Sequence, residues 1–138
     1  MVSKKSAALV LVALLGAAAA QAHHSFSSTF DAHKPIEITG VITKVEWINP
    51  HSYVHMDVKD KSGKTVPWAF ESLPPAMFKR AGLKKEMLPI GSTVTITGFG
   101  AKDGTQALGW IKKFKFADGR EIQVTADNPS DANFVDVH

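Results

Sequence analysis

The 138-residue chain contains no cysteine, and this absence excludes several kinds of site at once. Disulfide bonds and thiolate metal sites cannot form, and the cysteine that anchors a bacterial lipoprotein is missing as well. Whatever fold the chain adopts must therefore be stabilised by its hydrophobic core alone.

The chain also lacks an apolar run long enough to cross a bilayer. Lys4 and Lys5 lie near the N-terminus, and residues 6–19 are mostly alanine, leucine and valine. Ala20-Gln21-Ala22 then places small residues at alternate positions. This apolar run is shorter than the about 20 residues that a membrane-spanning helix requires. The pattern predicts a Sec-type signal peptide over residues 1–22, cleaved after Ala22. We expect a periplasmic or secreted protein with no stable membrane anchor after cleavage.

No strong excess of one charge is present. The chain has 16 basic and 13 acidic residues, for a formal charge of +3. Loss of Lys4 and Lys5 with the signal peptide leaves 14 basic residues, so the formal charge falls to +1. The sequence has no basic stripe of the kind that binds a phosphate backbone. We therefore expect no nucleic-acid partner.

Apolar and polar residues alternate from residue 36 onward, which is typical of β-strands. The alternating segments are residues 36–47, 51–59, 65–71, 92–98, 108–116 and 121–124. A helical spacing interrupts them after Pro75 and ends at Gly82. Gly40 falls where the first alternation breaks step and predicts a bulge or bend. The expected organisation is an N-terminal arm over 23–35, a β domain over 36–126 and a flexible tail over 127–138.

The order of these elements predicts the fold class. Three strands, a short helix and two or three more strands are the order of an oligonucleotide/oligosaccharide-binding (OB) barrel. We therefore predict a mainly β protein, an OB-like barrel of five to six strands with one short helix between strands three and four. A small β-sandwich is the alternative.

Two adjacent histidines, His23 and His24, follow the predicted cleavage site, and both are predicted to take part in a metal site. Cleavage after Ala22 would free the α-amino group of His23 beside its own imidazole. The amine titrates near pH 8 and the ring near 6.5, so both can act as nitrogen ligands close to neutral pH. With one further imidazole they form a set of nitrogens that suits Cu(II), an arrangement known as a histidine brace. Copper is therefore the predicted cofactor.

His51 is the predicted third ligand, because it follows Pro50 where the second strand begins. Glu71 is predicted to add an axial oxygen or to orient a histidine ring. His55 and Asp57 are further candidates on the polar face of the second strand. Since four residues of strand span about 13 Å, at most one of His51 and His55 can join a single metal site.

The same residues also fit simpler interpretations. The polar face of the second strand could be solvent-exposed with no ligand, or it could bind a small ligand or dock another protein of the cell envelope. No nucleophile elbow, zinc-protease helix or phosphate-binding loop occurs, so no enzymatic function is predicted. Trp47, Trp68, Phe70 and Trp110 alternate with aliphatic residues and are predicted to pack in the core.

Several short motifs resemble a known family. HHSF at residues 23–26, NPH at 49–51 and WAFE at 68–71 are similar to a family of small exported bacterial proteins whose domain is of unknown function. The resemblance extends from His23 to about Val124. It implies export and a β fold, and it implies no activity. The function we expect is metal binding or delivery, most readily of copper, and the alternative is a non-enzymatic adaptor.

Overall fold

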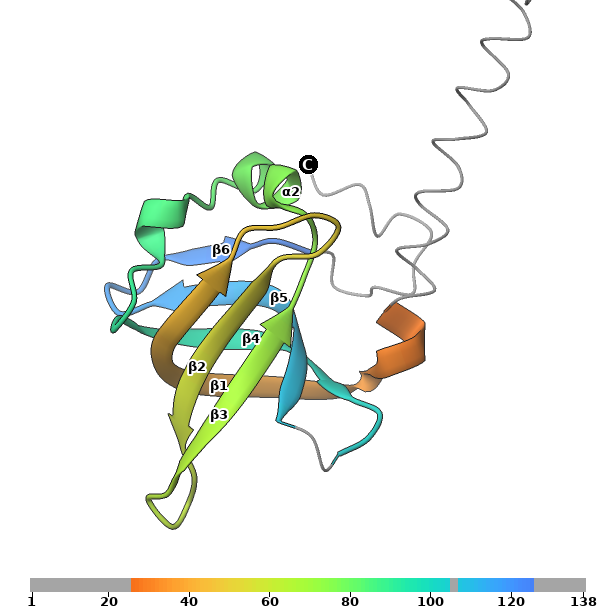
Figure 1. Ribbon diagram of the computed structural model, residues 1–138, viewed down its shortest axis with the longest axis vertical. Helices are drawn as coiled ribbons and strands as arrows, with labels where there is room; N and C mark the ends of the chain where they lie inside the picture. Colours follow the sequence, from red (N-terminus) through yellow and green to blue (C-terminus); the bar gives the residue numbers. More distant parts are fainter. Residues whose placement is uncertain (1–25, 105–106, 126–138) are drawn as a thin grey trace, which may run out of the picture.

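The computed structural model describes residues 26–104 and 107–125. Strands dominate this part of the chain, with one short α-helix and one 3-10 helix between the third and fourth strands (Figure 1). In chain order the elements are β1 (Phe30–Glu46), β2 (Tyr53–Lys59), β3 (Thr65–Glu71), α2 (Pro75–Arg80), η1 (Lys85–Met87), β4 (Thr93–Ala101), β5 (Leu108–Phe116) and β6 (Glu121–Gln123).

The strands close into a barrel with the topology of an OB fold. The sheet order is β3-β2-β1-β4-β5-β6, and β3 also pairs with β5 in parallel. This last pairing closes a ring of five strands, and β6 adds to β5 outside the ring. Such closure, with a helix between β3 and β4, confirms the predicted OB-like barrel and excludes the two-sheet sandwich.

Strand β1 is long enough to serve both sides of the barrel. Residues 35–41 pair with β4, whereas residues 41–46 pair with β2. The register of β1 shifts between Ile42 and Lys44 in its pairing with β2 and between Phe30 and Pro35 in its pairing with β4, so neither shift falls at Gly40, where an irregularity was predicted. Gly40 instead permits a close approach, because a Cβ there would lie 2.7 Å from the Asp57 carbonyl oxygen.

The barrel begins earlier than the sequence predicts. Residues 26–29 form a helical turn and β1 starts at Phe30, so much of the predicted arm over 23–35 is ordered secondary structure. The reason is burial, since Phe26 and Phe30 are 2% and 1% exposed. The predicted signal peptide, residues 23–25 and the predicted tail lie outside the described residues.

Two apolar clusters form the core. The larger one fills the barrel under α2, whose Phe78 is fully buried, and α2 ends before Gly82, which has a φ of +88°. The smaller cluster consists of Phe26, Phe30, Leu73, Phe99 and Trp110. Of the aromatic residues predicted for the core, Phe70 and Trp110 are fully buried, whereas Trp47 and Trp68 are half-buried at its edge. Within the described residues, no helix has the length and apolar character needed to span a membrane.

Candidate functional site

His51 lies in the loop that joins β1 to β2, at the barrel end nearest α2 (Figure 1). Two backbone hydrogen bonds hold this loop against the segment between β3 and α2. Ser52 N–H donates to the Leu73 carbonyl at 3.2 Å, and Ser72 N–H donates to the Ser52 carbonyl at 3.0 Å. The backbone beside His51 is therefore fixed by the barrel.

Glu71 contacts the ring of His51. Glu71 ends β3 and lies opposite Tyr53 of β2 and Trp110 of β5. Its Oε1 is within hydrogen-bonding distance of His51 Nδ1, and both side chains are 14% exposed. A carboxylate that accepts from Nδ1–H fixes the ring orientation and leaves Nε2 as the nitrogen for a ligand. Of the two predicted roles for Glu71, this geometry matches the orienting one.

The aromatic cluster packs against the other side of His51. The Trp110 ring meets the His51 ring edge to face, with centroids 6.0 Å apart and an interplanar angle of 86°. Phe26 packs on the same indole, with centroids 5.4 Å apart. One buried indole therefore separates His51 from the first described residue of the chain. His23 and His24, the other predicted ligands, lie outside the described residues.

His55 forms a second, separate pair. Its Nε2 is 2.7 Å from Glu46 Oε2, and Lys44 Nζ is 2.7 Å from Glu46 Oε1. The hydrogen bond from Lys44, followed by that from His55, lowers the pKa of Glu46 below its usual value of 4.5. Asp57, the remaining candidate, is exposed, follows His55 by two residues on β2 and lies opposite Val41 of β1.

The described residues do not complete a metal site. Across residues 26–104 and 107–125, no three histidine, aspartate or glutamate side chains converge where they could hold one ion. The predicted set of His51, Glu71, His55 and Asp57 is thus divided, and only His51 and Glu71 come together. Any further ligand to His51 must come from the rest of the chain or from a partner.

Tyr53 and Glu46 belong to this region, although the sequence did not mark them as site residues. Tyr53 pairs with Glu46 on one side and with Glu71 on the other. Burial, and then the charges of Glu71 and Glu46, raise the pKa of the Tyr53 phenol above its usual value of 10.0. The antiparallel pairing of β1 with β2 was the signal that could have found Glu46, but its register depends on the shift after Ile42.

Fold and geometry together define a small OB-barrel protein with a part-buried histidine–carboxylate pair at one end. The chain belongs to the family of unknown function DUF6152, whose model matches residues 10–125. This membership confirms the family resemblance seen in the sequence. A search of curated proteins finds no match to the chain.

Solved structures with a similar fold share little sequence with this chain. The matched chain of a crystallised complex of TiaS with tRNA and ATP is 17% identical with a TM-score of 0.44, over 62% of this chain and 18% of that one. The mitochondrial single-stranded DNA binding protein Rim1 from S. cerevisiae is 12% identical with a TM-score of 0.46, over 61% and 93%. The N-terminal domain of PriB from Thermoanaerobacter tencongensis is 14% identical with a TM-score of 0.38, over 56% and 90%. Likenesses of this degree say nothing about what the present chain binds.

Proposed function

We propose that this protein is an exported copper-binding protein, in which His51 and the histidines at the mature N-terminus hold Cu(II). The observation that carries the proposal is the Glu71–His51 pair, which directs Nε2 of a part-buried imidazole away from its carboxylate partner. Histidines that bind metals commonly donate their other ring nitrogen to a carboxylate in this way. Glu71 acts as the orienting residue, and the role of the protein is binding or delivery without turnover.

The remaining nitrogen ligands come from His23, assisted by His24. Cleavage after Ala22 converts the backbone nitrogen of His23 from an amide into an amine, which can bind a metal together with the ring of the same residue. Cu(II) favours nitrogen ligands in a tetragonal arrangement and binds most tightly among the divalent metals of its row. Removal of the signal peptide thus creates the ligand on which the site depends.

The anchored position of Phe26 supports this arrangement. Phe26 is buried on Trp110, which also contacts His51, and His23 precedes Phe26 by three residues. Three residues of extended chain reach roughly 10 Å. This reach is comparable with the separation of the Phe26 and His51 rings, which is at most about 11 Å by way of the Trp110 ring.

Competition titration with Cu(II) tests the proposal on three forms of the mature protein. The first begins at His23 with a free amine, the second has the same sequence with that amine acetylated, and the third is His51→Ala. We expect the acetylation and the substitution each to weaken binding by about 100-fold, since each removes one nitrogen ligand worth a few kcal/mol. His33→Ala is the control, because His33 is exposed on β1. Unchanged affinity in both altered forms would show that the proposed ligand set is wrong.

A second candidate function is docking of a small ligand or an envelope protein on the polar face of β2. A shallow pocket of about 330 Å³ favours it, and His55, Lys44 and Trp68 are among the residues that line this pocket. In that case His55→Ala would abolish partner binding and leave copper affinity unchanged. The copper proposal predicts that His51→Ala weakens Cu(II) binding and leaves partner binding unchanged.

A further inference from the structure

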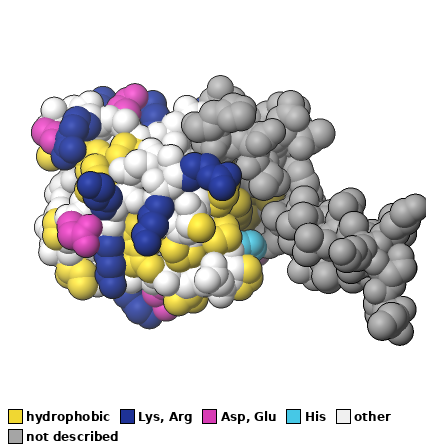
Figure 2. Space-filling view, turned by 90° about the horizontal axis from the view of Figure 1, so that it is seen from above, with side chains coloured by type: hydrophobic (Ala, Val, Ile, Leu, Met, Phe, Trp, Pro, Cys, Tyr) yellow, Lys and Arg dark blue, Asp and Glu magenta, His cyan; other side chains and the backbone are white. Residues whose placement is uncertain are grey.

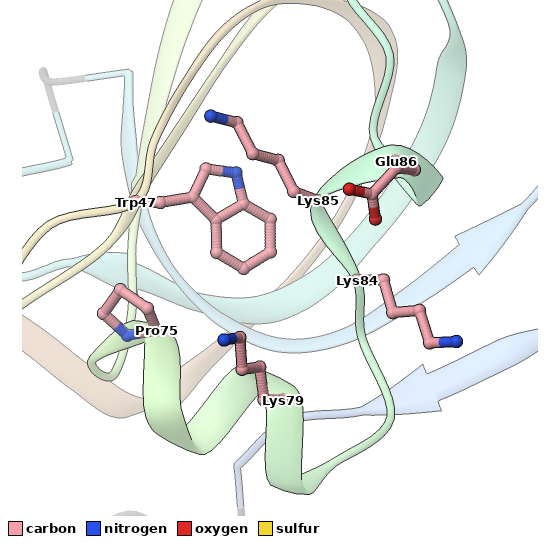
Figure 3. A pocket seen from close by; sticks show the side chains of 6 residues that line it. All are labelled: Trp47, Pro75, Lys79, Lys84, Lys85 and Glu86. Carbon is pink, nitrogen blue, oxygen red and sulfur yellow. The ribbon is translucent and has the colours of Figure 1, made fainter.

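A second concave site lies beside α2, and neither histidine pair contributes to it. This groove has a volume of about 480 Å³ (Figure 3). Its walls come from the β1–β2 loop, α2 and the segment around η1, and the residues that line it are Trp47, Pro75, Lys79, Lys84, Lys85 and Glu86. Ligand pockets for small molecules typically measure about 300–1,000 Å³, so the groove has the size of a binding site.

The Trp47 indole provides a rigid apolar wall. Trp47 is half-buried, and its ring packs edge to face on Phe78 with centroids 5.4 Å apart and an interplanar angle of 87°. Phe78 is itself fully buried, so the indole rests on a fixed part of the core. Pro75 adds a second apolar surface. A flat apolar group could therefore stack on the indole, and the protein would lose little conformational entropy because this wall is already ordered.

The rim of the groove is positively charged. Lys79, Lys84 and Lys85 line it together with one carboxylate, Glu86. No side chain among the described residues forms an ion pair or hydrogen bond with these three ammonium groups. In Figure 3 the side chains of Lys79 and Lys85 extend along opposite sides of the indole, whereas the side chain of Lys84 extends away from the indole. Figure 2, the view from above Figure 1, shows lysine and arginine side chains around an apolar patch with few acidic ones.

Trp47 also carries a donor that the described protein does not use. Its Nε1–H is buried and has no hydrogen-bond acceptor among the described residues. Buried donors are nearly always paired in folded proteins, so this unpaired N–H is unusual. Because the N–H is buried, it does not open onto the groove, which offers a ligand a flat apolar wall and two nearby cations.

We propose that this groove binds a small organic anion with a flat apolar body, such as an aromatic carboxylate, sulfonate or phosphate. The apolar body stacks on Trp47, and the acidic group is attracted by the positive charges of Lys79 and Lys85 on either side of the indole. An inorganic anion should bind weakly, because it cannot stack on Trp47. A neutral aromatic ring should also bind weakly, because it gains nothing from the lysine charges. This site is independent of the proposed copper site.

The test follows the Trp47 indole N–H signal in ¹⁵N–¹H spectra of the purified protein. The chain has three tryptophans, so the signal of Trp47 is identified by its loss in Trp47→Phe. Naphthalene-2-sulfonate is the probe, and 2-naphthalenemethanol is its neutral analogue. We expect saturable movement of this signal with the sulfonate and at least about fivefold weaker binding of the alcohol, as for loss of an exposed charge pair.

Variants separate specific binding from general attraction. Lys79→Gln and Lys85→Gln should each weaken sulfonate binding by about threefold to fivefold, whereas Lys61→Gln, at the exposed β2–β3 turn, should have no effect. The proposal is wrong if the alcohol binds as well as the sulfonate, or if Lys61→Gln weakens binding as much as Lys79→Gln. It is equally wrong if oligothymidylate or anionic lipid vesicles move the signal while the sulfonate does not.

Discussion

Truncation of Phe26 tests whether the start of the described chain is anchored beside His51. Phe26 is 2% exposed, and its ring contacts those of Phe30, Phe99 and Trp110. Replacement of a buried phenylalanine by alanine typically costs about 3–5 kcal/mol. Because Phe26 lies outside the strands, in the smaller apolar cluster, the cavity can partly collapse, and we expect a loss near the lower limit, about 3 kcal/mol.

Urea unfolding followed by tryptophan fluorescence measures this loss. For a domain of this size, about 3 kcal/mol corresponds to a fall in Tm on the order of 10–20 °C. Phe114→Ala is the matched control, because Phe114 is fully buried in the larger core cluster. Both variants should lose comparable stability. A loss below about 1 kcal/mol for Phe26→Ala would refute the anchoring of this segment.

The two variants should differ in copper affinity. Release of the segment that follows His23 lowers the effective concentration of the N-terminal nitrogens at His51, so Phe26→Ala should weaken Cu(II) binding by about tenfold. Phe114→Ala should bind Cu(II) as the wild type does when both are measured well below their unfolding temperatures. Equal Cu(II) affinities in the two variants would show that the anchoring of Phe26 does not contribute to the proposed copper site.

Three further predictions concern the same end of the barrel and its strands. Glu71→Gln should lower Cu(II) affinity by about tenfold to 100-fold in competition titrations, as loss of a residue that orients a metal ligand does; unchanged affinity would remove Glu71 from the site. Tyr53 is the only tyrosine, so the ultraviolet absorbance of its phenolate should titrate above pH 10.0 in the folded protein and closer to 10.0 in urea, with Glu71→Gln lowering the folded midpoint. Gly98→Ala should destabilise the fold by more than about 3 kcal/mol in urea unfolding, because a Cβ there would lie 1.7 Å from the Trp110 carbonyl oxygen.

The pH dependence of the Glu46 pair has a definite sign. The folded pKa of Glu46 lies below 4.5, so its interactions stabilise the fold above pH 4.5, and this contribution is lost as the pH falls through the lowered pKa. Urea unfolding of the wild type and Glu46→Gln should therefore differ at neutral pH and converge in acid. A difference that grows in acid would contradict the assignment.

The barrel could be predicted from local patterns because its strands have one buried and one exposed face. Val54 and Met56 are fully buried on β2, while the neighbouring Tyr53 and His55 are half-exposed, as the alternation predicted. Pro75 and Gly82 likewise bracket α2 as expected. Where residue spacing alone decides the local structure, the sequence was sufficient.

The N-terminal boundary and the division of the site could not be predicted in this way. Phe26 and Phe30 are buried by Phe99 and Trp110, which lie about 70 to 85 residues further along the chain, so no local pattern reveals their burial. The pairing of His55 with Glu46 depends on a register shift after Ile42 that alternation does not specify. The groove beside Trp47 likewise forms only when η1 packs near the β1–β2 loop.

The central claim is that Cu(II) is held by nitrogens from His51 and the N-terminal residue. The most direct test is electron paramagnetic resonance of the Cu(II)-loaded mature protein and of His51→Ala, with nitrogen superhyperfine splitting as the readout. The account predicts superhyperfine splitting from three nitrogen ligands, the amine and ring of His23 and the ring of His51, and the loss of one of these nitrogens in His51→Ala. Identical spectra from the two proteins would contradict it.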